Sequence, residues 1–413
     1  MFLLLLILKL INNNAKYHII MTITSRILTL TLSLFFMISL LAQEVDNNNK
    51  TNFKFGGFAK ADYIFTQYNN GSYNGAGRDF HIPSTIPVGD QSIYQYTDFH
   101  IKESRFNFDV STLVKGKKLR AFVEMDFMLS PGGNERVSNS FNPRIRHFFL
   151  EYDKFLFGQT WSTFMIVILP DELDFIGAPE GVVFQRQPMA RVTLGAWQFA
   201  LENKFTTISP YEGGSRITSE AAFLPDFIAR YNYKFNSGSI SLAVIGRELN
   251  YIDETKTKHS AFGAGLTFGG KLKVFKKDDI RFSVTAGKGL GRYVALNFVN
   301  SAVIDSSLQL ETISTINGYF SYLHHWNNKL RSSASISYFK ADNNQDLTGG
   351  SVNDEAYSAS VNLIYAPFDK LILGVEPIYG YRKLAEGTDG DFFRLQFSAK
   401  YAFSFKTSVS NKR

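Results

Sequence analysis

The sequence contains no cysteine among its 413 residues. A disulfide framework, a thiolate-bound zinc or iron–sulfur site and a thiol nucleophile are therefore excluded. Mean hydropathy is only −0.10, so this is not a polytopic helical membrane protein, which needs repeated apolar runs of about 20 residues. The net charge is also small, because 44 Lys and Arg stand against 37 Asp and Glu. This mild and diffuse positive excess does not predict a nucleic-acid partner.

What the chain has in abundance is aromatic and other apolar residues. Hydrophobic residues make up 45% of the sequence, which excludes wholesale disorder, and 39 Phe and 20 Tyr stand against only 3 Trp.

The N-terminus has the pattern of a secretory signal peptide. Met21 opens a polar stretch with Arg26, followed by the apolar run 27–41 and Ala42. We expect residues 1–42 to be a cleaved signal region, with Met21 as the true start. The alternative is a membrane anchor, for which this run is short. A polar linker, 43–52, a barrel domain, 53–405, and a C-terminal tail, 406–413, are expected to follow.

From Phe53 onward, apolar and polar residues alternate with a period of two. In the last such segment, Phe393, Phe397 and Phe405 share one face, whereas Arg394 and Lys400 share the other. Side chains of a strand point alternately to opposite sides, so each such segment has an apolar and a polar face.

Sixteen segments of this kind can be counted, separated alternately by short turns and long loops. They are Phe53–Thr66, Phe99–Leu113, Leu119–Leu129, Arg144–Tyr152, Phe155–Phe164, Arg191–Gly195, Trp197–Phe205, Pro225–Phe235, Ser239–Leu249, Ser260–Phe275, Ile280–Leu290, Ile313–His325, Leu330–Lys340, Glu355–Ala366, Leu371–Arg382 and Asp391–Phe405.

This arrangement predicts an all-β fold, a transmembrane antiparallel β-barrel of about 16 strands. Outer-membrane barrels have an even number of strands, short periplasmic turns, long outer loops and an apolar outer face. The sheet must close, because backbone groups cannot stay unpaired in lipid. A soluble β-sandwich or propeller would also alternate, but the long aliphatic and aromatic faces favour lipid contact.

Motifs for catalysis or cofactor binding are scarce. The glycines at 287, 289 and 291 open no helix and do not match a dinucleotide-binding pattern. His324 and His325 are adjacent, so on one strand they point to opposite faces and cannot chelate a metal together. We expect no enzyme activity, no cofactor and no metal site.

Arginine on the polar faces is the informative feature. The alternation points eight arginines into the lumen, together with several acids. Rings of Arg or Lys line anion pathways, and arginine binds carboxylates through its planar fork. The alternative is that these arginines pair across strands and only maintain the barrel shape. The inward arginines are Arg105, Arg120, Arg230, Arg247, Arg281, Arg331, Arg382 and Arg394.

The loop 165–190 is long enough to fold into the lumen. It carries Asp171, Asp174 and Arg186, besides other acids. Folded inward, it would form a constriction with acids on one side and arginines opposite, a transverse field that orients anionic solutes. The alternative is a loop that caps the outer surface.

Several short motifs resemble the DcaP-like trimeric outer-membrane porin family. They occur between residues 146 and 403, and the resemblance covers the whole expected barrel, roughly Phe53 to Phe405. They include Phe155–Phe164, Arg146-His147, Phe184-x-Arg186-Gln187-Pro188, Leu224-Pro225-Asp226, Arg247-Glu248-Leu249, Gly291-Arg292-Tyr293, His325-Trp326 and 394–403.

The resemblance implies a homotrimer of sixteen-stranded barrels that passes small anions, especially dicarboxylates. The sequence departs from the pattern of this family in two places. Only Gln43–Asn52 precedes the first strand, so no N-terminal coiled coil is expected. The chain also continues past Phe405 for eight residues, so the barrel-assembly signal is expected to be internal.

The sequence therefore predicts an outer-membrane porin for small hydrophilic solutes, anions such as dicarboxylates foremost. The alternative is an outer-membrane barrel with an enzymatic, adhesive or structural role. The expected partners of the porin are small anions, outer-membrane lipid and further copies of the same chain, but no nucleic acid. The residues expected to line the pore and constriction are Arg105, Arg120, Glu124, Asp126, Asp171, Asp174, Arg186, Arg230, Arg247, Arg331, Arg382 and Arg394.

Overall fold

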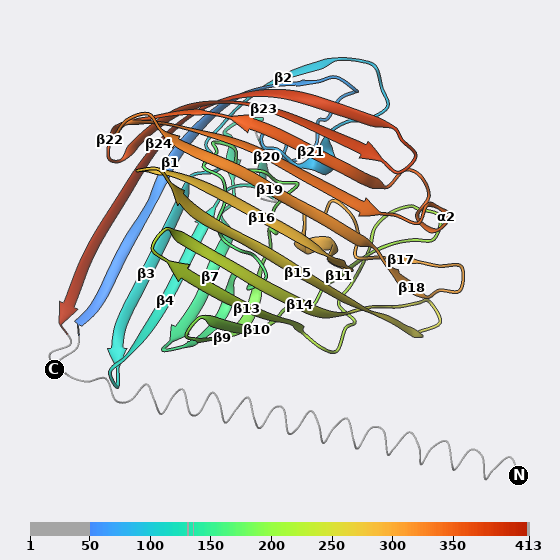
Figure 1. Cartoon of the computed structure of the whole chain (residues 1–413), viewed down its shortest axis with the longest axis horizontal. Coiled ribbons are helices and arrows are strands. Elements are labelled where there is room, and N and C mark those ends of the chain that lie inside the picture. Colours follow the sequence, from blue (N-terminus) through green and yellow to red (C-terminus); the bar gives the residue numbers. More distant parts are fainter. Residues whose placement is uncertain (1–49, 130–131, 135, 411–413) are drawn as a thin grey trace, which may run out of the picture.

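The computed structural model describes residues 50–129, 132–134 and 136–410 (Figure 1). The expected signal region, 1–42, lies outside them. The described chain forms one closed antiparallel barrel, in which the first wall strand pairs with the last. Strand β1 pairs with β24 along its whole length, from Lys50↔Ser410 to Tyr68↔Phe392. The all-β barrel is confirmed.

Sixteen wall strands make up the barrel, as expected. The first eight are β1 (Lys50–Tyr68), β2 (Tyr94–His100) with β3 (Arg105–Val114), β4 (Lys117–Asp126), β7 (Arg144–Tyr152), β8 (Phe155–Trp161), β9 (Arg186–Leu194), β10 (Trp197–Glu202) and β13 (Asp226–Phe235). The other eight are β14 (Gly238–Ile252), β15 (Lys258–Val274), β16 (Asp278–Lys288), β19 (Ser314–His325), β20 (Leu330–Asp342), β21 (Asn353–Val361) with β22 (Leu363–Phe368), β23 (Leu371–Leu384) and β24 (Asp389–Ser410).

Two wall strands that the sequence predicted as continuous are interrupted. The second breaks at residues 101–104, between β2 and β3, and both pieces pair with β1. The fourteenth breaks at Asn362, between β21 and β22. Asn362 uses its backbone N–H to bond Ser333 across the break, so the sheet stays joined there.

The sixth strand is longer than predicted. Instead of a short segment starting at Arg191, β9 begins at Arg186 and pairs with β8 on one side and β10 on the other. The strands at the chain ends also extend beyond the expected barrel bounds of 53 and 405, because β1 starts at Lys50 and β24 runs to Ser410.

The connections differ sharply between the two ends of the barrel. At the end where β1 begins, they are tight turns. At the other end, most connections are long, apart from 253–257 and 385–388. The long ones carry small elements of their own: η1 (Pro83–Thr85), β5 (Gly133–Asn134), β6 (Ser140–Phe141), β11 (Thr206–Ser209), β12 (Ile217–Ser219), η2 (Gly291–Tyr293), β17 (Ala302–Ile304), β18 (Leu310–Thr312) and α2 (Gln345–Thr348). Of these, β12, β11, β17 and β18 form a separate four-stranded sheet.

The wall alternates as the sequence predicted. On β24, Phe393, Phe397 and Phe405 are exposed on the outward face, whereas Arg394 and Gln396 are buried toward the lumen. The outward face is therefore an apolar surface suited to lipid, and the inward face carries the polar groups that can build a site.

No helix among the described residues is both long and apolar enough to cross a membrane.

Candidate functional site

The connection between β8 and β9, residues 162–185, crosses the lumen; we call it the constriction loop. Lumen-facing arginines at intervals around the wall contact the loop along its length. Arg230 on β13 donates to the carbonyl of Met165 at 2.7 Å, and Arg281 on β16 donates to that of Leu169 at 2.8 Å. The inward fold of this loop is confirmed.

Further along the loop, arginines pair with its acids. Arg331 on β20 lies 2.6 Å from Asp171, and Arg394 on β24 lies 3.4 Å from Asp174. The order of the contacts along the loop matches the order of the strands around the wall. These arginines fix the loop across the barrel from β13 to β24, and we call this stretch the anchor wall.

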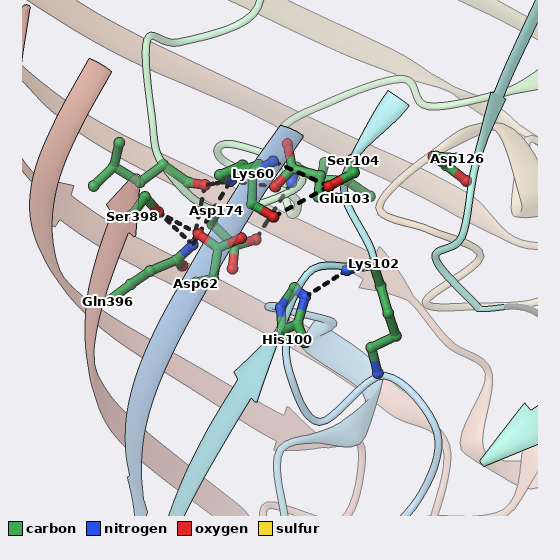
Figure 2. A network of polar contacts seen from close by, with 12 residues as sticks. Lys60, Asp62, His100, Lys102, Glu103, Ser104, Asp126, Asp174, Gln396 and Ser398 are labelled. Atoms are coloured by element: carbon green, nitrogen blue, oxygen red, sulfur yellow. Dashed lines mark hydrogen bonds and ion pairs between the residues drawn. The ribbon is translucent and has the colours of Figure 1, made fainter. Parts of the chain in front are cut away.

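A compact polar network holds the middle of the loop. Lys60 on β1 donates to the carbonyl of Leu173 and also pairs with Glu103, which the break in the second strand turns inward (Figure 2). From β23, Glu376 accepts the backbone N–H groups of Leu173 and Asp174 at 2.9 and 3.0 Å. These contacts leave the loop little freedom to move.

The end of the loop is fixed through Glu180. Its fully buried carboxylate accepts hydrogen bonds from the hydroxyls of Ser337 and Ser358 and lies 3.0 Å from the His81 ring. Burial raises the pKa of Glu180, but His81 and the two hydroxyls lower it more, so its pKa lies below the ordinary value. His81 belongs to the 69–93 connection, so a second outer loop is tied to the constriction loop here.

Between the constriction loop and strands β3, β4, β7 and β8 lies a cavity of about 600 Å³. One side is formed by loop residues, among them Val167, Glu172 and Phe175. The other side is formed by lumen-facing residues of β3, β4, β7 and β8; we call these strands, together with β9, the cavity wall. Lys400 on β24 closes the cavity beyond β1.

A bulge in β7 concentrates charge on the cavity wall. Opposite Glu124 and Met125, the register steps from His147 to Ile145, so Arg146 is an extra residue. A bulge of this kind breaks the alternation. Arg146 and His147 are consecutive, yet both line the cavity.

The cavity wall carries more positive than negative charge. Arg146 lies 2.9 Å from Glu124 and 2.7 Å from Asp126, and Asp126 also accepts from Arg144 at 2.9 Å. Arg105 is 3.6 Å from Glu124. These three arginines thus share two carboxylates.

Arg186 adds a further positive charge to this group. At the start of β9, it lies within electrostatic reach of three arginines, Arg144, Arg146 and Arg105, and of one carboxylate, Asp126, which is already paired with Arg144 and Arg146. Among the described residues, no carboxylate pairs with it, and its buried Nη1 has no hydrogen-bond partner. Its guanidinium lies over the Trp161 ring, 4.8 Å from the centroid. Cation–π contact holds the charge in place without neutralising it.

Lys400 is a second cation of this kind. It has no carboxylate partner in the described part of the chain, and its ammonium lies 5.2 Å from the centre of the Phe58 ring. The guanidinium of Arg105 lies 5.1 Å from the same ring. The cavity is therefore bordered by cations mounted on aromatic rings.

The loop contributes one carboxylate of unusual character. Burial raises the pKa of Glu172, and the nearby Asp174 raises it further; hydrogen bonds from Ser335, Ser360 and the Ala178 N–H do not offset this. Glu172 therefore takes up a proton at a higher pH than an ordinary glutamate would. Because Glu172 lines the cavity, this protonation changes the charge of the cavity.

The structure divides the twelve expected pore residues into distinct groups. Arg105, Glu124, Asp126 and Arg186 come together around the cavity. Asp171, Asp174, Arg230, Arg331 and Arg394 instead form the loop anchors, and Asp174 also borders the cavity. Arg120 pairs with Asp109 and Glu151, Arg382 bonds Asn353 and the Ile86 carbonyl, and Arg247 is buried under another loop.

Two expectations are therefore corrected. Arg186 is not part of the loop but the first residue of β9, paired with Trp161. The loop acids Asp171 and Asp174 do not face open arginines across the pore, because Arg331 and Arg394 bind them directly.

Among the cavity residues missing from the expected set are Arg146, Trp161 and Lys400. Arg144, which shares Asp126 with Arg146, was missing too. The alternation of Arg144 and Arg146 with Ile145 was a usable signal for these two arginines, and Lys400 shares the polar face of Arg394. In the part of the chain that the structure describes, no group of three or more His, Cys, Asp or Glu residues could hold a metal ion.

Comparison with known proteins agrees with this architecture. The family model described as DcaP outer membrane protein matches residues 44–403. No curated protein sequence matches the chain significantly.

Solved structures are similar in fold. The outer membrane channel DcaP of Acinetobacter baumannii aligns with a TM-score of 0.69 at 22% identity, over 87% of this chain and 99% of that one. An anion-selective porin from Comamonas acidovorans aligns with a TM-score of 0.53 at 10% identity, over 86% and 100%. OmpT of Vibrio cholerae aligns with a TM-score of 0.50 at 10% identity, over 87% and 99%.

Proposed function

The chain belongs to the DcaP outer membrane protein family and is an outer-membrane channel; we propose that it prefers anions and takes small dianions such as dicarboxylates. The observation that carries the proposal is the excess positive charge on the cavity wall, above all the Arg186 guanidinium, which forms no ion pair with a carboxylate of the described residues.

The geometry of the cations supports a dianion as the preferred solute. Arg105, Arg144, Arg146 and Arg186 share two wall carboxylates, Glu124 and Asp126, so this part of the wall keeps an excess of positive charge. Glu103 also acts on Arg105 but is paired with Lys60, and the acids Glu172 and Asp174 lie on the loop side of the cavity. Arginine forks bind carboxylates through paired hydrogen bonds, so a solute with two carboxylates could engage two of them in turn. Aromatic rings beneath the cations keep them extended toward the cavity.

Current block by a dicarboxylate tests the proposal. Purified channels in a planar bilayer conduct chloride, and succinate added to one side should reduce that current in a concentration-dependent way. The block should weaken in Arg186→Gln and persist in Arg382→Gln, because Arg382 bonds Asn353 and Ile86 away from the cavity. Equal block of wild type and Arg186→Gln would contradict the role of this wall.

We further propose that the channel is a homotrimer, as the resemblance to a trimeric porin family implies. The wall from β7 to β10 favours a protein neighbour over lipid. These strands have 9, 7, 9 and 6 residues. At about 3.3 Å per residue and a tilt of about 40°, seven residues rise only about 18 Å, less than an apolar band of about 25 Å.

Native mass spectrometry in a mild detergent tests this assembly. A trimer is the expected species, and charged substitutions at the outward-facing Phe148 and Leu150 of β7 should dissociate it. The same substitutions at Val244 and Leu266, outward on the longer β14 and β15, serve as the control. A strictly monomeric wild type would contradict the proposal.

A further inference from the structure

Part of the lumen face is apolar, contrary to the pattern of a water-filled barrel. Ile228 on β13 and Ala243 and Ile245 on β14 face inward and are at most 3% exposed. On β20, Phe339 also faces inward and is fully buried. Barrel interiors that line a channel are polar, so these residues need a cover.

The cover is the first half of the connection between β16 and β19. Residues 290–299 fold into the lumen and pack on this wall, and we call them the inner plug. Tyr293, Val294 and Phe298 are at most 1% exposed, and Phe298 packs against Phe339 with ring centroids 5.2 Å apart. The plug and this part of the wall form an apolar core inside the barrel.

The plug is joined directly to the constriction loop. Val183 and Val294 form an antiparallel bridge, flanked by hydrogen bonds from the Phe184 N–H to the Tyr293 carbonyl at 3.0 Å and from the Ala295 N–H to the Val182 carbonyl at 3.1 Å. The two loops therefore make one continuous partition rather than a single loop across an open lumen.

Buried polar anchors hold the plug against the wall. Arg247 on β14 donates to the carbonyls of Gly289 and Leu290, both at 3.1 Å, and lies 3.4 Å from Asp226. The Tyr293 hydroxyl donates to Asp226 at 2.7 Å and accepts from Gln187 at 2.7 Å. Arg247 was expected to line the pore; its position under the plug explains why it does not.

We propose that the inner plug seals the sector of the lumen beside β13, β14, β20 and β21, and so confines solutes to the charged cavity beside β3 to β9. An apolar core at close-packed density has no room for water. A solute then has no route that bypasses the cavity wall. The inference rests on the chain being a channel, but not on its preference for anions.

A matched cysteine pair tests whether the sector is dry. The natural chain has no cysteine, so each variant carries one thiol. Val167→Cys places it in the cavity, where Val167 is 50% exposed; Val294→Cys places it in the plug, where Val294 is 0% exposed. A small water-soluble thiosulfonate should label the first in the folded barrel and the second only after heat unfolding.

The label is measured by mass, so the result does not depend on whether anions are preferred. Similar labelling rates for the two folded variants would overturn the proposal. Conductance supplies the second arm: Phe298→Ala loosens the plug and should raise single-channel conductance while lowering charge selectivity. Folded Phe298→Ala channels with wild-type conductance and selectivity would also overturn it. Should that variant fail to show the heat-modifiable mobility of a folded barrel, the cysteine pair alone decides.

Discussion

The anchor wall and the cavity wall of the barrel carry the same residue type on the same face, yet they use it differently. On the anchor wall, Arg331 and Arg394 reach acids of the constriction loop, and Arg230 reaches one of its backbone carbonyls. On the cavity wall, Arg105 lines a space of about 600 Å³ instead, and Arg186 lies over the ring of Trp161, which lines the same space. The role of a lumen arginine is thus set by what lies opposite it, not by its strand position.

This difference has an energetic consequence. Asp174 and Arg394 have side chains only 2% and 1% exposed, so removing one leaves the other as a buried unpaired charge. Such a loss costs about 3–5 kcal/mol, whereas neutralising a cation in a wet cavity costs little stability. Substitutions on the anchor wall should therefore change the structure, and those on the cavity wall should change selectivity.

The largest effect is expected from Arg394→Gln. Loss of this anchor leaves Asp174 unpaired, destabilises the folded barrel by about 3–5 kcal/mol and releases the constriction loop. Heat-modifiable gel mobility should show a lower unfolding temperature, and single-channel traces should become larger and noisier. Wild-type stability and quiet wild-type steps would show that Arg394 does not anchor the loop.

A smaller effect, on selectivity rather than on stability, is expected from Glu124→Gln. It removes one of the two carboxylates that offset the cavity arginines, so anion preference should increase without loss of the folded state. Glu151→Gln is the matched control, because Glu151 carries the same charge but, among the described residues, forms its ion pair with Arg120, 3.4 Å away. If both variants shift the reversal potential equally, location in the cavity does not matter.

Lys400→Met should lower anion preference less than removal of an arginine does. The methionine keeps much of the contact with Phe58 but loses the charge, and lysine lacks the fork that binds carboxylates in pairs. The reversal potential in a low-salt gradient measures the change, since salt screens such charges beyond about 8–10 Å. A shift toward stronger anion preference would contradict this assignment.

The smallest expected effect is a pH dependence through Glu172. Its pKa lies above the ordinary value, mainly because it is buried, so acidification neutralises it at a higher pH than an ordinary glutamate. Losing this negative charge in the cavity should raise anion preference as pH falls. Glu172→Gln should already show the raised preference at neutral pH and lose that part of the pH response. An unchanged pH response in this variant would exclude Glu172 as its source.

The sequence was sufficient to predict sixteen strands, because the period of two persists over most of each wall strand. The length and charge of the connection 165–190 predicted the inward loop. The sixth strand was underestimated because it contains Pro188, and proline cannot donate to a ladder. In the structure, Pro188 lies in β9 opposite Gln159, with its ring exposed. Its carbonyl still accepts from the Asn203 N–H.

The division between anchors and cavity residues could not be predicted in the same way. Arg230 and Arg281 bind the backbone carbonyls of Met165 and Leu169, and every residue has such a carbonyl, so no sequence pattern marks these two as partners. The bulge at Arg146 depends on register between β4 and β7, which alternation alone does not specify. The apolar lumen core was not predicted, because a period of two does not reveal which inward positions a distant loop will cover.

The most direct test of the account is the reversal potential of Arg186→Gln across a low-salt gradient, with Arg382→Gln as the control. One charge about 4 Å from another is worth about 4 kcal/mol at an effective dielectric of about 20, and far less in a wet pore. A partial shift is therefore predicted. Wild type and Arg382→Gln should be anion-preferring, and Arg186→Gln should be clearly less so. An unselective wild type, or an Arg186→Gln channel with the wild-type potential, would contradict the claim that the cavity wall sets selectivity.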